Sequence, residues 1–164
     1  MQLTIYSTCL LILLFVVSLR GAQPERLIVW IALTIDVADQ VYHALYGLSS
    51  FTEIDWIHVA LDTAGFCGVL WVALGANRFW PLPVCSLHLL GLTGHAAVLL
   101  GVPGLNQIYW AMLNVTDYLQ VPIILLGMIA HIRRVDRIGQ YRSWRKGWLV
   151  PPFLVSRHQR AAAA

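Results

Sequence analysis

Two pairs of ionisable residues stand four positions apart in neighbouring apolar segments, Asp39 with His43 and His58 with Asp62. Residues four apart share one face of a helix. The stretch SSFTE between the pairs is rich in turn-forming residues, which predicts an antiparallel helical hairpin with His43 level with His58 and Asp39 level with Asp62. Imidazole and carboxylate groups in this arrangement can share a metal such as zinc or iron, and an unfilled coordination position would let a bound water become a nucleophile.

A further ligand for such a metal is predicted in the later apolar segments, either His95 or Asp117. Haem b is a weaker alternative, in which His43 or His58 would face His95, because carboxylates crowd those histidines and fit an apolar haem pocket poorly. No HExxH, CxxC or histidine-box series is present. Only the four-residue spacing therefore supports the metal hypothesis.

A second set of polar residues is predicted to line the same core as a hydrogen-bonded network or a proton relay. An ionised aspartate at mid-membrane costs about 2.5 to 3.5 kcal/mol, so these groups must be neutralised, paired or hydrated. Counting about 1.5 Å per residue places most of them in the same half of the membrane as the hairpin, with the first apolar segment peripheral to them. The set comprises Asp36, His88, Asn114, Asp117 and Gln120.

Composition identifies the elements that must position these groups. The chain of 164 residues is 59% hydrophobic and only 12% charged, with a mean hydropathy of +0.69, which is typical of an integral membrane protein. The fold class predicted is all-α, with residues 1–131 forming a bundle of five transmembrane helices. The expected spans cover about residues 3–19, 27–47, 54–74, 80–100 and 108–130.

Basic residues give the orientation. With five spans, all 11 Lys and Arg residues fall on one side of the membrane, and the loops near Ser50 and Gly104 carry none. The positive-inside rule then predicts an outside N-terminus, a cytoplasmic C-terminus and a polar core that opens to the outer face. The formal charge of +3 reflects these loops rather than a surface for nucleic acid.

The predicted cytoplasmic tail, residues 132–164, is basic and contains tryptophan. Such a segment can lie against anionic lipid, at about 1 kcal/mol per basic group, or can simply anchor the topology. The residues expected at the lipid interface are Arg133, Arg134, Arg137, Arg142, Arg145, Lys146, Trp144 and Trp148. Anionic lipids, other membrane subunits and a second copy of the chain are the expected partners.

Three segments, DVADQVYHALYG, DWIHVALD and ANRFWPL, together with PER before the second span, resemble a group of short inner-membrane proteins of alphaproteobacteria such as sphingomonads. The similarity covers most of the chain from Gly21 to Arg134. It implies a multi-pass protein of a bacterial inner membrane, and it implies no activity or residue role.

Three functions are compatible with this sequence. The expected one is an accessory, assembly or structural subunit of a larger membrane complex, in which the polar core holds helices together. The first alternative is a membrane-embedded metal-binding or haem-binding enzyme or redox protein that uses the hairpin. The second is a component of a proton-coupled transporter, which the lack of repeated halves disfavours unless the chain oligomerises.

Overall fold

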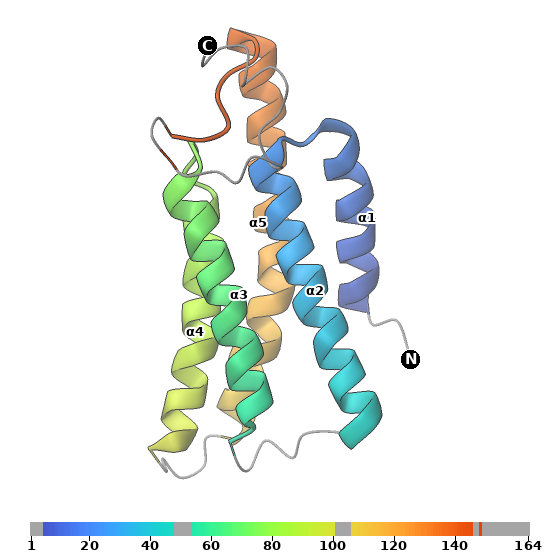
Figure 1. Cartoon of the computed structure of the whole chain (residues 1–164), viewed down its shortest axis with the longest axis vertical. Coiled ribbons are helices and arrows are strands. Elements are labelled where there is room, and N and C mark those ends of the chain that lie inside the picture. The colour runs from blue at the N-terminus through green and yellow to red at the C-terminus, as the bar shows by residue number, and fades with distance from the viewer. Residues whose placement is uncertain (1–4, 48–53, 101–105, 146–147, 149–164) are drawn as a thin grey trace.

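The structure, a computed structural model of the 164-residue chain, describes residues 5–47, 54–100, 106–145 and 148. Within these residues it is all-helical, without a strand, as the hydropathy pattern predicts (Figure 1). The helices are α1 (Ile5–Arg20), α2 (Gln23–Tyr46), α3 (Trp56–Gly75), α4 (Pro81–Leu99) and α5 (Asn106–Ile138).

Local sequence signals set the helix ends. Proline stands in the first turn of both α2 and α4, where its missing N–H is not needed. Asp55 caps α3, with its Oδ1 accepting a hydrogen bond of 3.0 Å from the backbone N–H of Ile57. Gly139 terminates α5 in the left-handed region at φ +77°, where a side chain would be strained.

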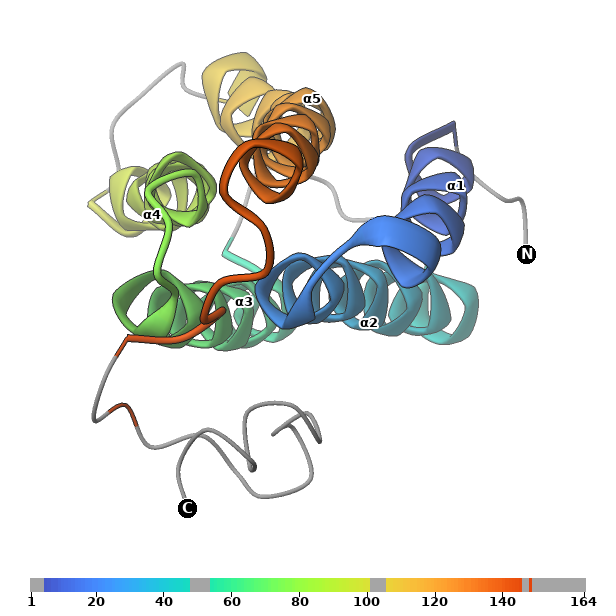
Figure 2. The same ribbon diagram turned by 90° about the horizontal axis from the view of Figure 1, so that it is seen from above.

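The helices run alternately up and down, and α2, α3, α4 and α5 enclose the centre of the bundle (Figures 1 and 2). α1 packs at the side, against α2 and α5. This topology gathers the described basic residues at one end of the bundle, here called the basic end, which holds the α1–α2 link, the α3–α4 link and the end of α5. The α2–α3 hairpin connection lies at the opposite end, here called the hairpin end.

Four of the helices, α2 to α5, are long and apolar enough to cross a membrane. The 16 described residues of α1 are apolar but extend only about 24 Å, less than the roughly 30 Å of hydrocarbon that a span must cross.

The fifth helix is longer than predicted, since it ends at Ile138 rather than near Ala130. The apolar pattern stops at Ala130, but the arginines that follow are good helix formers, so the helix continues after its apolar run has ended. Its 33 residues span about 50 Å, and its last turns project beyond the other helices at the basic end (Figure 1).

An apolar core fills the half of the bundle next to the basic end. Its fully buried members come from every helix and include Val17, Ile28, Val72, Val84 and Ile124. Large apolar side chains are also exposed around the outside, such as Phe15 at 67% and Leu126 at 64%. An outward-facing apolar surface over a packed interior is what a lipid-embedded bundle requires.

A buried ion pair lies beyond this core, between Arg78 Nη1 and Glu25 Oε1. The side chain of Glu25 is 0% exposed and that of Arg78 is 4% exposed, and Trp80 Nε1 donates a hydrogen bond of 3.2 Å to the same carboxylate. Glu25 lies in the first turn of α2 and Arg78 lies in the α3–α4 link, and both side chains are buried.

The segment after α5 folds back across the basic end, and its described residues, 139–145 and 148, are here called the C-terminal strap (Figure 2). The backbone N–H of Asn77 donates to the carbonyl of Ser143 at 3.0 Å, and that of Arg145 donates to the carbonyl of Gly75 at 2.8 Å. Tyr141 packs under Arg134, whose guanidinium lies 4.2 Å from the ring centroid. Burial raises the pKa of the Tyr141 hydroxyl, which stays protonated and lies 2.8 Å from His131 Nδ1.

The strap corrects one expectation for the tail. Trp144 is only 5% exposed, stacks on Trp71 and donates a hydrogen bond of 2.6 Å to Gln23 Oε1, so it contacts protein rather than lipid. Trp148 is half-buried beside Trp71. The arginines predicted at the interface are exposed, namely Arg133, Arg134, Arg137, Arg142 and Arg145, whereas Lys146 lies outside the described residues.

Replacing Trp144 with alanine should loosen the strap without unfolding the bundle, because Trp144 is the buried aromatic side chain of the strap and lies outside the five helices. We expect faster tryptic cleavage after Arg142 and Arg145, since proteolysis samples the locally open state. The control is Trp30→Ala, which truncates a 53% exposed side chain on α2. Equal cleavage rates in both variants and the parent would contradict an anchoring role for Trp144.

Candidate metal centre and polar cavity

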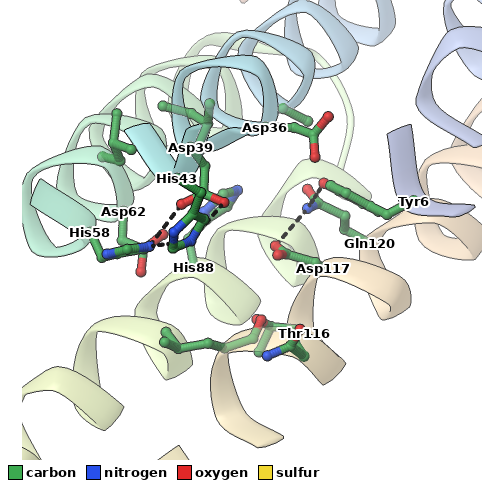
Figure 3. A pocket seen from close by; sticks show the side chains of 16 residues that line it. Tyr6, Asp36, Asp39, His43, His58, Asp62, His88, Thr116, Asp117 and Gln120 are labelled. Atoms are coloured by element: carbon green, nitrogen blue, oxygen red, sulfur yellow. Dashed lines mark hydrogen bonds and ion pairs between the residues drawn. The ribbon is translucent and has the colours of Figure 1, made fainter. Parts of the chain in front are cut away.

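A cavity of about 160 Å³ lies in the half of the bundle next to the hairpin end (Figure 3). All five helices contribute to its wall, from Tyr6 of α1 to Gln120 of α5. Four carboxylates line it, those of Asp36, Asp39, Asp62 and Asp117, and its described lining contains no lysine or arginine. The cavity therefore attracts cations and hydrogen-bond donors.

One wall of the cavity brings together Asp39, His43 and His58. His58 Nε2 lies 3.2 Å from His43 Nε2 and 2.8 Å from Asp39 Oδ1, and His43 Nε2 lies 3.7 Å from Asp39 Oδ2. Ligand atoms from all three residues fall within 4.8 Å of one another. The hairpin thus brings His43 to His58, as the four-residue spacing predicts, and Asp39 also contacts His58.

Groups behind the two histidines hold their rings. The backbone carbonyl of Gly47 lies 2.8 Å from His43 Nδ1, so this nitrogen donates and Nε2 is left free to bind. Asp55 Oδ2 lies 2.9 Å from His58 Nδ1 as a charge contact, since the ring is not aligned for a straight hydrogen bond. Tyr42 fixes Asp55 by donating a hydrogen bond of 2.9 Å to the same oxygen.

The close approach of two imidazole nitrogens and a carboxylate oxygen allows the three residues either to share a proton or to coordinate a metal ion. Tetrahedral zinc with bonds to nitrogen of about 2.0 to 2.1 Å separates its ligand atoms by about 3.4 Å, close to the observed 3.2 Å between the two Nε2 atoms. Three protein ligands leave one position for water or substrate. The cluster is also accessible, because the side chain of Asp39 is 36% exposed and that of His43 is 22% exposed.

Asp62 and His95, both predicted as ligands, instead pair with each other. His95 Nε2 lies 2.7 Å from Asp62 Oδ2, and the hydroxyl of Tyr109 lies 2.7 Å from His95 Nδ1. Both nitrogens of this 3% exposed histidine are engaged, so His95 cannot bind the metal of the cluster without breaking a buried hydrogen bond. The difference arises because α4 presents His95 to Asp62 of α3 and to Tyr109 of α5 rather than to Asp39, His43 and His58.

The polar set predicted as a network or relay is split between two walls. His88 lines the cavity on the same side as Asp39, His43 and His58 (Figure 3), and its Nε2 is buried without a hydrogen-bond partner among the described residues. Gly65 makes room for its ring, since a Cβ there would lie 3.2 Å from His88 Cε1. Asn114 lines the cavity and donates a hydrogen bond of 2.9 Å to the carbonyl of Trp110.

The polar groups of the opposite wall are hydroxyl, carboxyl and amide groups, and one of them, Tyr6, comes from α1 (Figure 3). Ser7 donates a hydrogen bond of 2.8 Å to Asp36 Oδ2, which also accepts one of 2.8 Å from Gln40. Gln120 Nε2 donates to the hydroxyl of Tyr6 and, at 3.3 Å, to Asp117 Oδ1. The first helix was predicted to be peripheral to the polar core. This prediction is wrong, because Tyr6 and Ser7 of α1 are buried against that core.

Several functional neighbours were not singled out from the sequence, namely Tyr6, Ser7, Gln40, Asp55 and Tyr109. The positions of Asp55 and Gln40 could have been predicted from the sequence, because Asp55 lies three residues from His58 and Gln40 lies four residues from Asp36, so each shares a helical face with a candidate residue. The positions of Tyr6 and Tyr109 could not, because tyrosine is also common at membrane interfaces and its partner depends on helix packing.

Comparison of the chain with protein-family models, with characterised proteins and with solved structures gives no match.

Proposed function

We propose that this protein is a multi-pass membrane protein that binds a divalent transition metal, zinc or iron, at Asp39, His43 and His58, and that it acts as a metal-dependent enzyme on a small ligand in the cavity. The observation that carries the proposal is the convergence of two histidine Nε2 atoms at 3.2 Å with a carboxylate oxygen 2.8 Å away. The Gly47 carbonyl behind His43 and the Asp55 carboxylate behind His58 support it, because metal-binding histidines almost always have such partners.

The chain's own groups suit this role. Asp39 and the two imidazoles would hold the metal at the accessible end of the cavity, where it would supply Lewis-acid activation of a bound water or substrate. Asp62 lies one helical turn further along α3 and lines the same cavity, so it could accept a proton from a bound molecule. Leu61 and Leu113 in the wall would limit the entry of bulk water.

The protein's setting in the membrane forms part of the proposal. We propose that α2 to α5, with α1 as a shorter fifth span, cross a bacterial inner membrane, with the basic end in the cytoplasm and the cavity facing outward. Collection of the described arginines at one end of the bundle supports this orientation under the positive-inside rule. The resemblance to alphaproteobacterial proteins supports the choice of membrane.

A channel or transporter is less well supported. The packed apolar core, with Val72, Val84 and Ile124 fully buried, lies between the cavity and the basic end. The Glu25 and Arg78 pair and the C-terminal strap lie beyond that core. A cavity accessible from one side suits binding or catalysis better than conduction.

A second candidate function is the accessory or assembly subunit. The specific observation in its favour is the chain of Asp62, His95 and Tyr109, which ties α3, α4 and α5 together through buried hydrogen bonds of 2.7 Å. Such bonds serve a structural role without any ligand. Other membrane subunits or a second copy of the chain would be its partners, with anionic lipid around the exposed arginines.

Metal analysis of the detergent-purified full chain tests between these candidates. The enzyme proposal expects zinc or iron at close to one equivalent, or uptake of one equivalent of Co²⁺ with a visible tetrahedral spectrum. A folded, colourless protein that contains no metal and takes up no Co²⁺ would refute the metal centre and leave the subunit role.

Acidification should weaken Co²⁺ binding steeply. The proposed ligand atoms of His43 and His58 are imidazole nitrogens, which bind a metal only when deprotonated, so protons compete with the metal. Below the ordinary imidazole pKa of about 6.5, each displaced proton should lower the affinity about tenfold per pH unit. Spectroscopic titrations across this range measure the slope, and a flat profile would contradict coordination by imidazole.

A further inference from the structure

We propose that the wall of the cavity opposite the metal cluster binds a primary ammonium group, so that the ligand of this cavity is a small amine. The site consists of Asp36, Asp117 and Gln120 and is here called the ammonium site. It does not depend on the metal proposal, and it names the class of molecule that the cavity accepts.

The first supporting observation is an unsatisfied buried acceptor. Gln120 is only 3% exposed and lines the cavity, and its Oε1 has no hydrogen-bond partner among the described residues. Its Nε2 donates to Tyr6 and Asp117, which fixes the amide with the oxygen as the free atom. A buried carbonyl without a hydrogen-bond donor destabilises the protein, and a bound donor would remove that cost.

The second observation is the charge of this wall. Asp36 and Asp117 both line the cavity, and its described lining offers them no lysine, arginine or histidine on this side (Figure 3). Their described hydrogen-bond partners, Ser7, Gln40 and Gln120, are neutral. Two carboxylates in a membrane protein without a basic partner must be neutralised, either by protons or by a cation from elsewhere.

The number and type of these groups match an ammonium ion. A primary ammonium has three N–H donors and no acceptor, and the site offers three acceptors, the carboxylates of Asp36 and Asp117 and Oε1 of Gln120. The cavity, at about 160 Å³, is much larger than a bare ion needs. Ala32, Ile35 and Leu113 supply apolar wall for the carbon atoms of an alkylamine.

Thermal unfolding of the full chain in detergent tests the proposal, with methylammonium, ethylammonium and propylammonium chloride as probes. Tetramethylammonium chloride, which has no N–H donor, and sodium chloride serve as controls at equal ionic strength. We expect a saturable rise in Tm with the primary amines alone. An equal rise with sodium would identify an inorganic cation site, and the absence of any rise would show that the carboxylates are neutralised by protons; either result overturns the amine proposal.

Variants assign the effect to this wall. Asp117→Asn should weaken the amine response about tenfold or more, because it removes a charged hydrogen-bond partner. Asp36→Asn should do the same and replaces Asp117→Asn if that variant does not fold. The matched control is His58→Gln on the opposite wall, which should lose Co²⁺ binding and keep the amine response.

The two proposals can fail separately. Loss of amine binding in His58→Gln, or an unchanged response in both aspartate variants, would contradict the ammonium site. Co²⁺ binding that persists in a protein without an amine response would leave the metal centre intact, and an amine response in a protein that takes up no Co²⁺ would leave the ammonium site intact.

Discussion

Replacement of His58 by alanine should abolish metal binding while the helical bundle stays folded. Its Nε2 lies within 3.2 Å of both other ligand groups, so it is the centre of the cluster. Loss of a partner behind a ligand costs about 10-fold to 100-fold in metal affinity, and loss of the ligand itself should cost at least about a hundredfold. Competition titration of the variant with Co²⁺ and a chromophoric chelator measures the change, with circular dichroism as the test of folding.

Matched variants separate ligands from neighbours. His43→Ala should behave like His58→Ala, and Asp55→Asn should show the smaller loss expected of a group behind a ligand. His95→Gln should retain metal, because His95 is held by Asp62 and Tyr109. Full Co²⁺ affinity in His58→Ala, or its loss in His95→Gln but not in His58→Ala, would show that the cluster is not the binding site.

Replacement of Glu25 by leucine should be the most destabilising single change at the basic end. It leaves the guanidinium of Arg78, 4% exposed, without its carboxylate partner. Removing one member of a buried ion pair costs about 3 to 5 kcal/mol, because the remaining charge is both desolvated and uncompensated. Thermal or denaturant unfolding in detergent, followed by circular dichroism, measures the loss.

The double variant Glu25→Leu/Arg78→Leu tests the cause. It should be more stable than Glu25→Leu, since it removes the isolated charge along with its partner. Asp136→Ala is the control, because Asp136 is an exposed carboxylate near the end of α5. Equal destabilisation by the double and single variants would mean that packing, rather than charge, explains the effect of Glu25.

The helices were predictable from the sequence because hydropathy and turn residues are local properties. Apolar runs bounded by Gly, Pro and polar links predicted α2, α3 and α4 to within a few residues of their observed ends. The same rule failed at the end of α5, because the helix continues after the apolar run has ended. It could not detect the strap either, since the burial of Trp144 depends on Trp71 and Gln23, more than 70 residues away along the chain.

Within the candidate site, the sequence by itself determined which residues share a helical face, namely Asp39 with His43 on α2 and His58 with Asp62 on α3. Only the tertiary structure decided which faces meet. The rotation of α4 about its own axis places His95 against Asp62 and Tyr109. The packing of α1 places Tyr6 against Gln120 and Ser7 against Asp36. The period of a helix is set by its own backbone, whereas its rotation and its neighbours follow from packing over the whole bundle.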